Sequence, residues 1–155
     1  RLIPDCVRSA ISGTPIRLRN PNHIRPWQHV LDPLFGYISL ADKMCQINGP
    51  EFASSWNFGP NQFSIATVKE VVSLFFETWN SETEILDHSE TSEYLETEIL
   101  KLDSSKASKF LNWEPKWNLE KSVNMTVDWY KALEAGKEMS TICLNQVSDF
   151  QVSNN

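Results

Sequence analysis

Three arginines offer the most definite chemistry in this sequence. Arg17, Arg19 and Arg25 lie within nine residues of one another, around a turn-forming stretch at 20–23, although the chain has a net charge of −6. A guanidinium presents a planar fork of N–H donors and stays protonated, so it suits a phosphate or a diphosphate. Trp27 and His29 follow closely and could add stacking or hydrogen bonding. The alternative is that the arginines occupy the polar face of a hairpin and pair with nearby acids, which stabilises a surface little.

Catalytic motifs are missing from the sequence. The glycines at 13, 36, 49, 59 and 136 never cluster, so a Gly-rich phosphate loop is not predicted. None of the three tyrosines is followed by a lysine four residues later, which excludes a Tyr-x-x-x-Lys pair. A Ser nucleophile elbow, a Walker lysine and a zinc-helix motif are also missing. The sequence therefore indicates a binding function more clearly than a catalytic one.

The weaker candidates have simpler structural explanations. Asn57 could hold a ligand, but a packed strand end explains the stretch 56–60 equally well. Six tryptophans could form a sugar-stacking platform, yet Trp79, Trp113 and Trp129 lie on or beside apolar helix faces and are expected in the core. Acidic pairs within 80–98 are typical of a solvated loop and give no reason for raised pKa values.

Composition restricts the class of protein. The chain has 155 residues, 41% hydrophobic and 22% charged, which fits one globular domain and excludes collagen-like and disordered classes. Its acidity argues against nucleic acid, and it lacks an apolar run of ~20 residues, so no membrane partner is expected. Three widely spaced cysteines predict the reducing cytoplasm, and the histidines lack metal-ligand spacing. The first residue is Arg rather than Met, so we expect a fragment.

Hydrophobic spacing and turn residues predict about five helices separated by short strands. The expected helices cover 3–12, 32–45, 67–79, 103–111 and 118–135, and the expected strands cover 16–19, 27–31, 56–60 and 99–102. Asp32, Asn118 and the Thr67–Glu70 capping box are the expected helix starts. Residues 80–98 are expected to form an acidic surface connection, and 151–155 a disordered polar tail.

The order of several motifs resembles one family. They are Arg1-Leu2-Ile3-Pro4-Asp5, Ile16 to Pro21, Arg25-Pro26-Trp27-Gln28-His29-Val30, Trp56-Asn57-Phe58-Gly59-Pro60, Leu100-Lys101-Leu102-Asp103, Leu111 to Trp117 and Thr126 to Tyr130. Together they are similar to the C-terminal half of CDP-glucose 4,6-dehydratases, extended short-chain dehydrogenases/reductases of bacterial deoxysugar and O-antigen synthesis. The resemblance covers residues 1–150.

The resemblance implies an α/β fold, helix-rich with short strands, that combines a substrate-binding lobe with the last Rossmann strand and helix. It implies that Arg25 contacts the diphosphate of a nucleotide sugar and that Arg1 lies close to the phosphates. The strand from Ile16 through Leu18 to Arg19 would line the base pocket. No catalytic, metal-binding or cofactor-binding residue is implied within the chain. Residues about 50–80 would pack on a missing Rossmann domain, leaving the apolar face of 68–76 partly uncovered.

The resemblance also implies what the chain lacks. Family members bind NAD and carry the catalytic Tyr/Lys pair in an N-terminal Rossmann half, so this chain is expected to bind no NAD and to be inactive alone. Its partners would be a nucleotide-sugar substrate and that half, within a homo-oligomer. A family His-Glu-Ala is replaced by Leu95-Glu96-Thr97, which leaves contacts from that loop open. Two alternatives remain: part of another nucleotide-sugar epimerase or reductase, or a stand-alone protein that binds a phosphorylated ligand.

Overall fold

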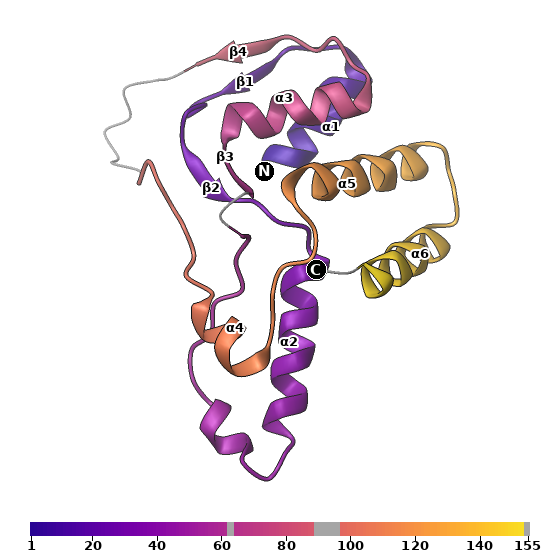
Figure 1. Ribbon diagram of the computed structural model, residues 1–155. Coiled ribbons are helices and arrows are strands. Elements are labelled where there is room, and N and C mark those ends of the chain that lie inside the picture. Colours follow the sequence, from indigo (N-terminus) through magenta and orange to yellow (C-terminus); the bar gives the residue numbers. More distant parts are fainter. Residues whose placement is uncertain (62–63, 89–96, 154–155) are drawn as a thin grey trace.

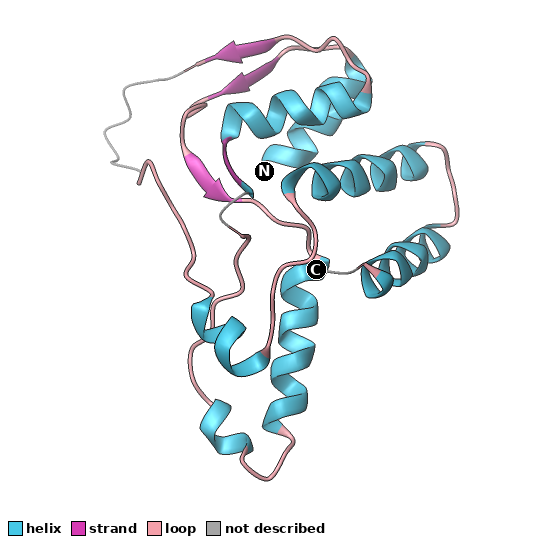
Figure 2. Ribbon diagram, viewed as in Figure 1, coloured by secondary structure: helices cyan, strands magenta, loops and turns pink. Residues whose placement is uncertain are grey.

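A computed structural model describes residues 1–61, 64–88 and 97–153. These residues form six α-helices, one short 3-10 helix and four strands (Figures 1 and 2). In chain order the elements are α1 (Leu2–Ser12), β1 (Ile16–Leu18), β2 (Ile24–Pro26), α2 (Leu31–Met44), η1 (Gly49–Phe52), β3 (Ile65–Thr67), α3 (Val68–Trp79), β4 (Ile85–Asp87), α4 (Ser105–Leu111), α5 (Leu119–Glu134) and α6 (Met139–Val152). The expected helix-rich α/β architecture with short strands is confirmed.

The elements divide between two ends of the molecule. Figure 1 shows β1 and β4 at the top with α1, α3 and α5, whereas α2 and α4 lie at the bottom. The main hydrophobic core is at the first end and consists of Cys6, Val7, Ile16, Leu18, Val72, Phe75, Phe76, Val123 and Val127. Two smaller clusters consist of Leu31, Trp117, Met125 and Phe150, and of Phe58, Ala107, Leu111 and Trp113.

Helix α1 forms where the sequence pattern predicts it. Val7 is buried, and Ile3 and Ala10 pack against the main core from the same side of the helix. Gly13 ends the helix at φ 67°, a left-handed conformation that glycine adopts without steric cost, and its N–H donates to Ser9 O at 2.9 Å. The predicted helix with its glycine stop is confirmed.

The predicted caps of α3 and α5 are also confirmed. Thr67 Oγ1 accepts a hydrogen bond from Glu70 N at 3.2 Å, and Glu70 Oε2 accepts one from Thr67 N at 2.7 Å. These bonds to Thr67 hold the pKa of Glu70 below its ordinary value. Asn118 Oδ1 accepts from Lys121 N at 2.9 Å and caps α5.

Strand β2 lies between two other segments of the chain. It pairs antiparallel with β3, with Arg25 opposite Ala66. On its other side Ile24 N donates to Glu98 O at 2.8 Å, and Leu100 N donates to Ile24 O at 3.1 Å. Backbone groups on both sides of this short strand are therefore satisfied, which fixes its position.

Several strand predictions are wrong in position. The second strand occupies 24–26 instead of 27–31, residues 56–60 form no strand, and 99–102 contributes only a bridge from Ile99 to Ile24. Within the predicted acidic connection, β4 pairs in parallel with β1. Partners distant in the sequence decide these short strands, and local patterns do not encode such partners.

The expected exposure of the α3 apolar face is wrong. Val71, Val72, Phe75 and Phe76 are at most 3% exposed. Helices α1 and α5 and strand β1 of the same chain cover this face. The predicted packing of residues about 50–80 on another domain stays a prediction, but it cannot depend on this face.

The predicted role of Asp32 as a helix cap is wrong as well. The N-cap of α2 is Val30, and Asp32 lies buried in the first turn of the helix. Its Oδ1 accepts a hydrogen bond from Lys116 N at 2.7 Å, which joins α2 to the segment before α5. Asp32 therefore connects two distant parts of the chain.

Helix α6 was not expected from the sequence, and the predicted disordered tail at 151–155 is wrong for its first residues. The helix continues through Val152, and Lys116 Nζ donates to Phe150 O at 3.3 Å and Ser153 O at 3.0 Å. A cation at carbonyl groups of the last turn stabilises a helix end. Residues 154–155 lie outside the described residues.

Apolar side chains form an exposed stripe along α2. Val30, Leu34 and Ile38 recur every four residues and are 59%, 43% and 64% exposed, and Tyr37 beside them is 57% exposed. Residues at this spacing share one face of a helix. We call these four residues the α2 stripe. Among the described residues, no helix is long and apolar enough to span a bilayer.

Removing the capping box should destabilise the chain. We expect Thr67→Ala to lower the free energy of unfolding by about 1 kcal/mol, because it leaves helical N–H groups without an acceptor. Urea denaturation measures the change, with Glu77→Gln in the same helix as the control. An unfolding free energy equal to that of the wild type would contradict the proposed role of the cap.

Candidate functional site

Both terminal nitrogens of the Arg25 guanidinium have acceptors within hydrogen-bond distance. Its Nη1 donates to Ile24 O at 2.9 Å, Thr97 O at 3.0 Å and, more weakly, Glu98 O at 3.4 Å, and its Nη2 lies 3.0 Å from His23 Nδ1. The side chain is half-buried and links β2 to the neighbouring segment. The structure therefore gives Arg25 a fixed position as well as a charge.

A cavity of about 290 Å³ opens beside Arg25. Its described lining residues are Ile24, Arg25, Pro26, Pro60, Ile65, Leu100, Lys101 and Leu102. Arg25 and Lys101 are the cationic members, and none of these lining residues is acidic. In a chain of net charge −6, such a local excess of positive charge favours an anionic ligand.

A close backbone approach holds two walls of this cavity together. Gly59 N donates to Ser104 Oγ at 2.7 Å, and a side chain at Gly59 would begin 2.6 Å from Leu102 Cβ. Only glycine therefore fits here without displacing Leu102, which lines the cavity together with Pro60, the neighbour of Gly59. The Asn57-x-Gly59 motif thus shapes the wall: Asn57 Nδ2 donates to Asp103 O at 3.3 Å.

The structure does not bring the other predicted site residues to this cavity. The side chains of Ile16 and Leu18 are 5% and 3% exposed and belong to the main core. Arg19 is exposed beyond the end of β1, and Arg1 is exposed at the start of α1, where its amino group lies 3.4 Å from Asp5 Oδ2. The predicted contacts of these four residues with a ligand stay predictions.

Lys101 is the residue that sequence reasoning missed. It enters the cavity lining because the stretch 99–102 runs beside β2, where Ile99 and Ile24 form a bridge. Its position in the Leu-Lys-Leu string contributed to the family resemblance, but no local pattern pairs it with Arg25. The Leu95-Glu96 substitution lies outside the described residues, whereas Thr97 contributes its carbonyl to Arg25.

Trp27 and His29 serve the structure around the site. Trp27 Nε1 donates to Ala66 O of β3 at 3.0 Å. His29 is 7% exposed, and its ring lies 4.8 Å from that of Trp117. Burial lowers the pKa of His29 to about 4, so its imidazole is neutral at pH 7. Leu31 N donates to His29 Nδ1 at 3.3 Å, which stabilises the start of α2.

A second cavity lies near the N-terminal end of α2, between α5 and α6. It has a volume of about 360 Å³ and is lined largely by apolar groups, including Leu31, Trp129 and Val147. No arginine or lysine is among its described lining residues. It is therefore less suited to a diphosphate than the Arg25 cavity, although it is larger.

The described residues offer neither a cluster of metal ligands nor a Gly-rich turn for NAD. No group of three His, Cys, Asp or Glu side chains among the described residues could hold a metal. A dinucleotide needs a Gly-rich turn between a strand and a helix. The positive-φ glycines, Gly13 and Gly136, instead follow the C-terminal ends of α1 and α5. No role proposed for the residues of this chain therefore passes through NAD.

Comparison with known proteins identifies the class of this fold. No protein-family model matches the chain. It is 39% identical over 150 residues to CDP-glucose 4,6-dehydratase of Salmonella typhimurium, which covers 97% of this chain and 41% of that protein. The chain thus spans less than half the length of this curated relative.

Solved structures agree on the fold. The dTDP-glucose 4,6-dehydratase of Bacillus anthracis in complex with NAD matches 88% of this chain and 41% of its own length, with a TM-score of 0.68 and 24% identity. The UDP-glucose 4-epimerase of Stenotrophomonas maltophila matches 88% and 41%, with a TM-score of 0.72 and 18% identity. The UDP-glucuronic acid 4-epimerase of Bacillus cereus matches 86% and 40%, with a TM-score of 0.71 and 16% identity.

The chain therefore has the fold of one part of an extended short-chain dehydrogenase/reductase, as the motif order predicted. Within that class, its sequence resembles the C-terminal half of CDP-glucose 4,6-dehydratase, and this predicted resemblance is confirmed.

The buried pair His29 and Asp32 should make stability depend on pH. Burial raises the pKa of Asp32 to about 6 despite its hydrogen bonds, so its contribution to stability is present below pH 4 and is lost as the pH rises through 6. Neutral His29 contributes in the opposite sense, and its contribution is lost as the pH falls from 6.5 to 4.

Asp32→Asn removes one of these two opposing effects. Between pH 7 and pH 4.5, we expect the unfolding free energy of the variant to fall further than that of the wild type, by on the order of 2 kcal/mol. In the wild type, protonation of Asp32 stabilises the fold as the pH falls and offsets the destabilising protonation of His29, whereas in the variant this offset is lost. Urea denaturation at both pH values measures this, with Asp42→Asn as the exposed control. Equal losses in Asp32→Asn and wild type would contradict the assignment.

Proposed function

We propose that this chain is the substrate-binding part of an NAD-dependent lyase that converts CDP-glucose to CDP-4-dehydro-6-deoxyglucose. The observation that carries the proposal is the 39% identity with CDP-glucose 4,6-dehydratase over 97% of the chain. The cationic cavity at Arg25 supports it, because a nucleoside diphosphate sugar carries its charge on two adjacent phosphates. The proposed compartment is the cytoplasm.

Arg25 is the proposed diphosphate ligand. Its Nη1 is occupied by backbone carbonyls, so the guanidinium is held in place before a ligand arrives. An oriented, permanently charged donor loses little freedom on binding, which favours affinity. Lys101 would add a second positive charge on the same cavity, as a point charge rather than a fork.

The other predicted ligands have narrower proposed roles. Arg19 and Arg1 are exposed and would approach the phosphates from solvent. Ile16 and Leu18 would support the base pocket through the position of β1, because their side chains fill the core. None of these residues is proposed to take part in proton or hydride transfer.

The catalytic steps are proposed to belong to another part of the enzyme. The resemblance implies an N-terminal Rossmann half that binds NAD, supplies hydride chemistry and carries the Tyr/Lys pair, within a homo-oligomer. This chain would bind and orient the sugar nucleotide, and alone it would turn over nothing. Residues about 50–80 are the segment proposed to pack on that half. The α2 stripe is the surface we propose for contact between copies of the chain within the homo-oligomer, since exposed apolar side chains in line mark interaction sites.

Loss of Arg25 should weaken nucleotide binding. We expect Arg25→Ala to reduce the affinity for CDP by at least about 2 kcal/mol, or roughly thirtyfold, because a charge-assisted contact is lost. Isothermal titration calorimetry measures this in the chain, and in the full-length enzyme where one is obtained. Arg17→Ala is the matched control, because Arg17 is exposed on β1 and lies outside the cavity lining.

Two outcomes would contradict this proposal. Equal affinities of Arg25→Ala and wild type would remove Arg25 from the site, provided that thermal melting shows both to be folded. Tighter binding of UDP or dTDP than of CDP would indicate that the chain belongs to another nucleotide-sugar epimerase or dehydratase. The similarity in fold to the two epimerase structures is compatible with that alternative as well.

A polar change on the α2 stripe should reduce self-association of the chain. We expect Ile38→Glu to lower the weight-average mass at high concentration with little change in thermal stability, because Ile38 is 64% exposed and contributes little to the core. Light scattering measures the mass, and Leu144→Glu, at a 68% exposed position on α6, is the control. Equal effects of the two variants would contradict a specific docking role for α2.

A further inference from the structure

We propose that His23 is the positioning residue that orients Arg25 toward its anionic ligand. This inference rests on the proposed function, because it concerns how the diphosphate cavity is prepared. The observation is the 3.0 Å separation between His23 Nδ1 and Arg25 Nη2. His23 is not among the described lining residues of the cavity, so the effect proposed for it passes through Arg25.

The chemistry of the two groups fixes their roles. A guanidinium only donates hydrogen bonds, so His23 Nδ1 must accept, and the imidazole proton must reside on Nε2. Arg25 Nη1 is already bound to the carbonyl oxygens of Ile24 and Thr97. His23 therefore restrains the opposite nitrogen, so that rotation of the guanidinium about its long axis is blocked at both ends.

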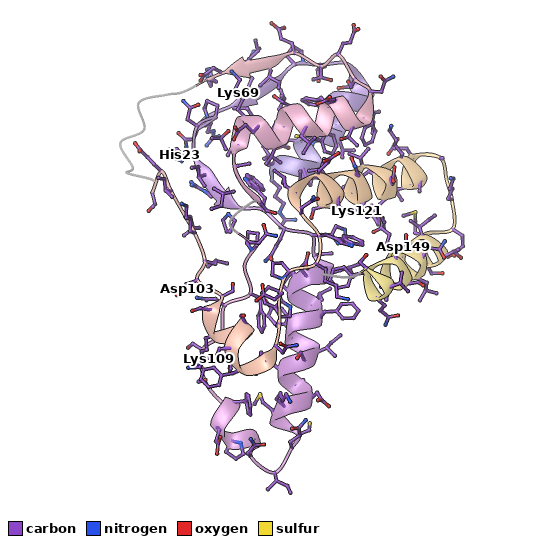
Figure 3. The ribbon with its side chains drawn as sticks, viewed as in Figure 1. His23, Lys69, Asp103, Lys109, Lys121 and Asp149 are labelled. Atoms are coloured by element: carbon purple, nitrogen blue, oxygen red, sulfur yellow. The ribbon has the colours of Figure 1, made fainter. Side chains whose placement is uncertain are left out.

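Hydrogen bonds fix the backbone of His23, so its side chain can hold the Arg25 guanidinium in one orientation. His23 N donates to Asn20 O at 3.2 Å, and Val68 N donates to His23 O at 2.9 Å. Lys69 N donates to Pro21 O at 2.9 Å, so the whole turn is fixed to the start of α3. Figure 3 shows His23 at this turn, on the same side of the molecule as Lys69.

Positioning should lower the cost of binding. Without His23, the outer edge of the guanidinium would sample more orientations, and a diphosphate would have to restrict them on binding. The neighbouring arginines Arg17 and Arg19 are exposed on or beside β1, and no side chain of the described residues holds either guanidinium as His23 holds that of Arg25. The restraint thus distinguishes Arg25 from the other two arginines of the cluster.

The test compares His23→Ala, His23→Asn and wild type. We expect His23→Ala to weaken CDP and inorganic pyrophosphate binding by about threefold to tenfold, the effect of one net hydrogen bond. Asn places Oδ1 where Nδ1 lies, so His23→Asn should restore affinity to within about twofold of wild type. Thermal melts check folding, and His88→Ala, an exposed histidine just beyond β4, is the matched control.

A spectroscopic measurement tests the inference without any variant. Long-range proton–nitrogen NMR of the wild-type chain should show His23 protonated on Nε2 and unprotonated on Nδ1. A proton on Nδ1 would overturn the inference, and so would equal affinities of folded His23→Ala and wild type. If wild type bound neither CDP nor pyrophosphate, the proposed function itself would fall, and the positioning role with it.

Discussion

The structure depends on the central place of β2, a strand of three residues with hydrogen-bonded neighbours on both sides. β3 pairs with one edge and the stretch 98–100 with the other, so residues far apart in the chain meet at one point. The Arg25 side chain extends this connection to the carbonyls of Thr97 and Glu98. The Arg25 cavity exists because these three segments converge.

The residues around β2 contribute both to the stability of the fold and to the proposed binding site. Arg25 links segments of the backbone, and the Thr67 capping box fastens β3 to α3 directly beside it. At the other end, Asp32 and Lys116 join α2, α6 and the segment before α5. A rigid scaffold with a charged group fixed in advance is what tight recognition of an anion requires. The exposed α2 stripe, in contrast, is a surface that the chain itself leaves uncovered.

Local signals predicted the elements that local forces determine. The Gly13 stop, the Thr67–Glu70 box and the Asn118 cap formed as expected, because each is complete within a few residues. Strand β4 and Lys101 were missed because their roles come from partners far along the chain. Helix α6 was missed because its N-cap is Glu138, not one of the residue types preferred there, and many of its side chains are exposed. Asp32 was misassigned because its partner is Lys116. Residue spacing drew attention to Arg17, Arg19 and Arg25 alike, and the motif order selected Arg25 among them, whose role as a ligand stays a proposal.

The most direct test of the central claim is an NMR map of amide shifts in the isotopically labelled chain during titration with CDP. The claim that this chain carries the sugar-nucleotide pocket predicts that the largest changes fall on the amides of Ile24 and Arg25, of Gly59 and Asn61, and of residues 99–102, which line the Arg25 cavity or adjoin its lining. Saturating CDP that left these amides unchanged, or shifted those of the apolar cavity between α5 and α6 instead, would contradict it.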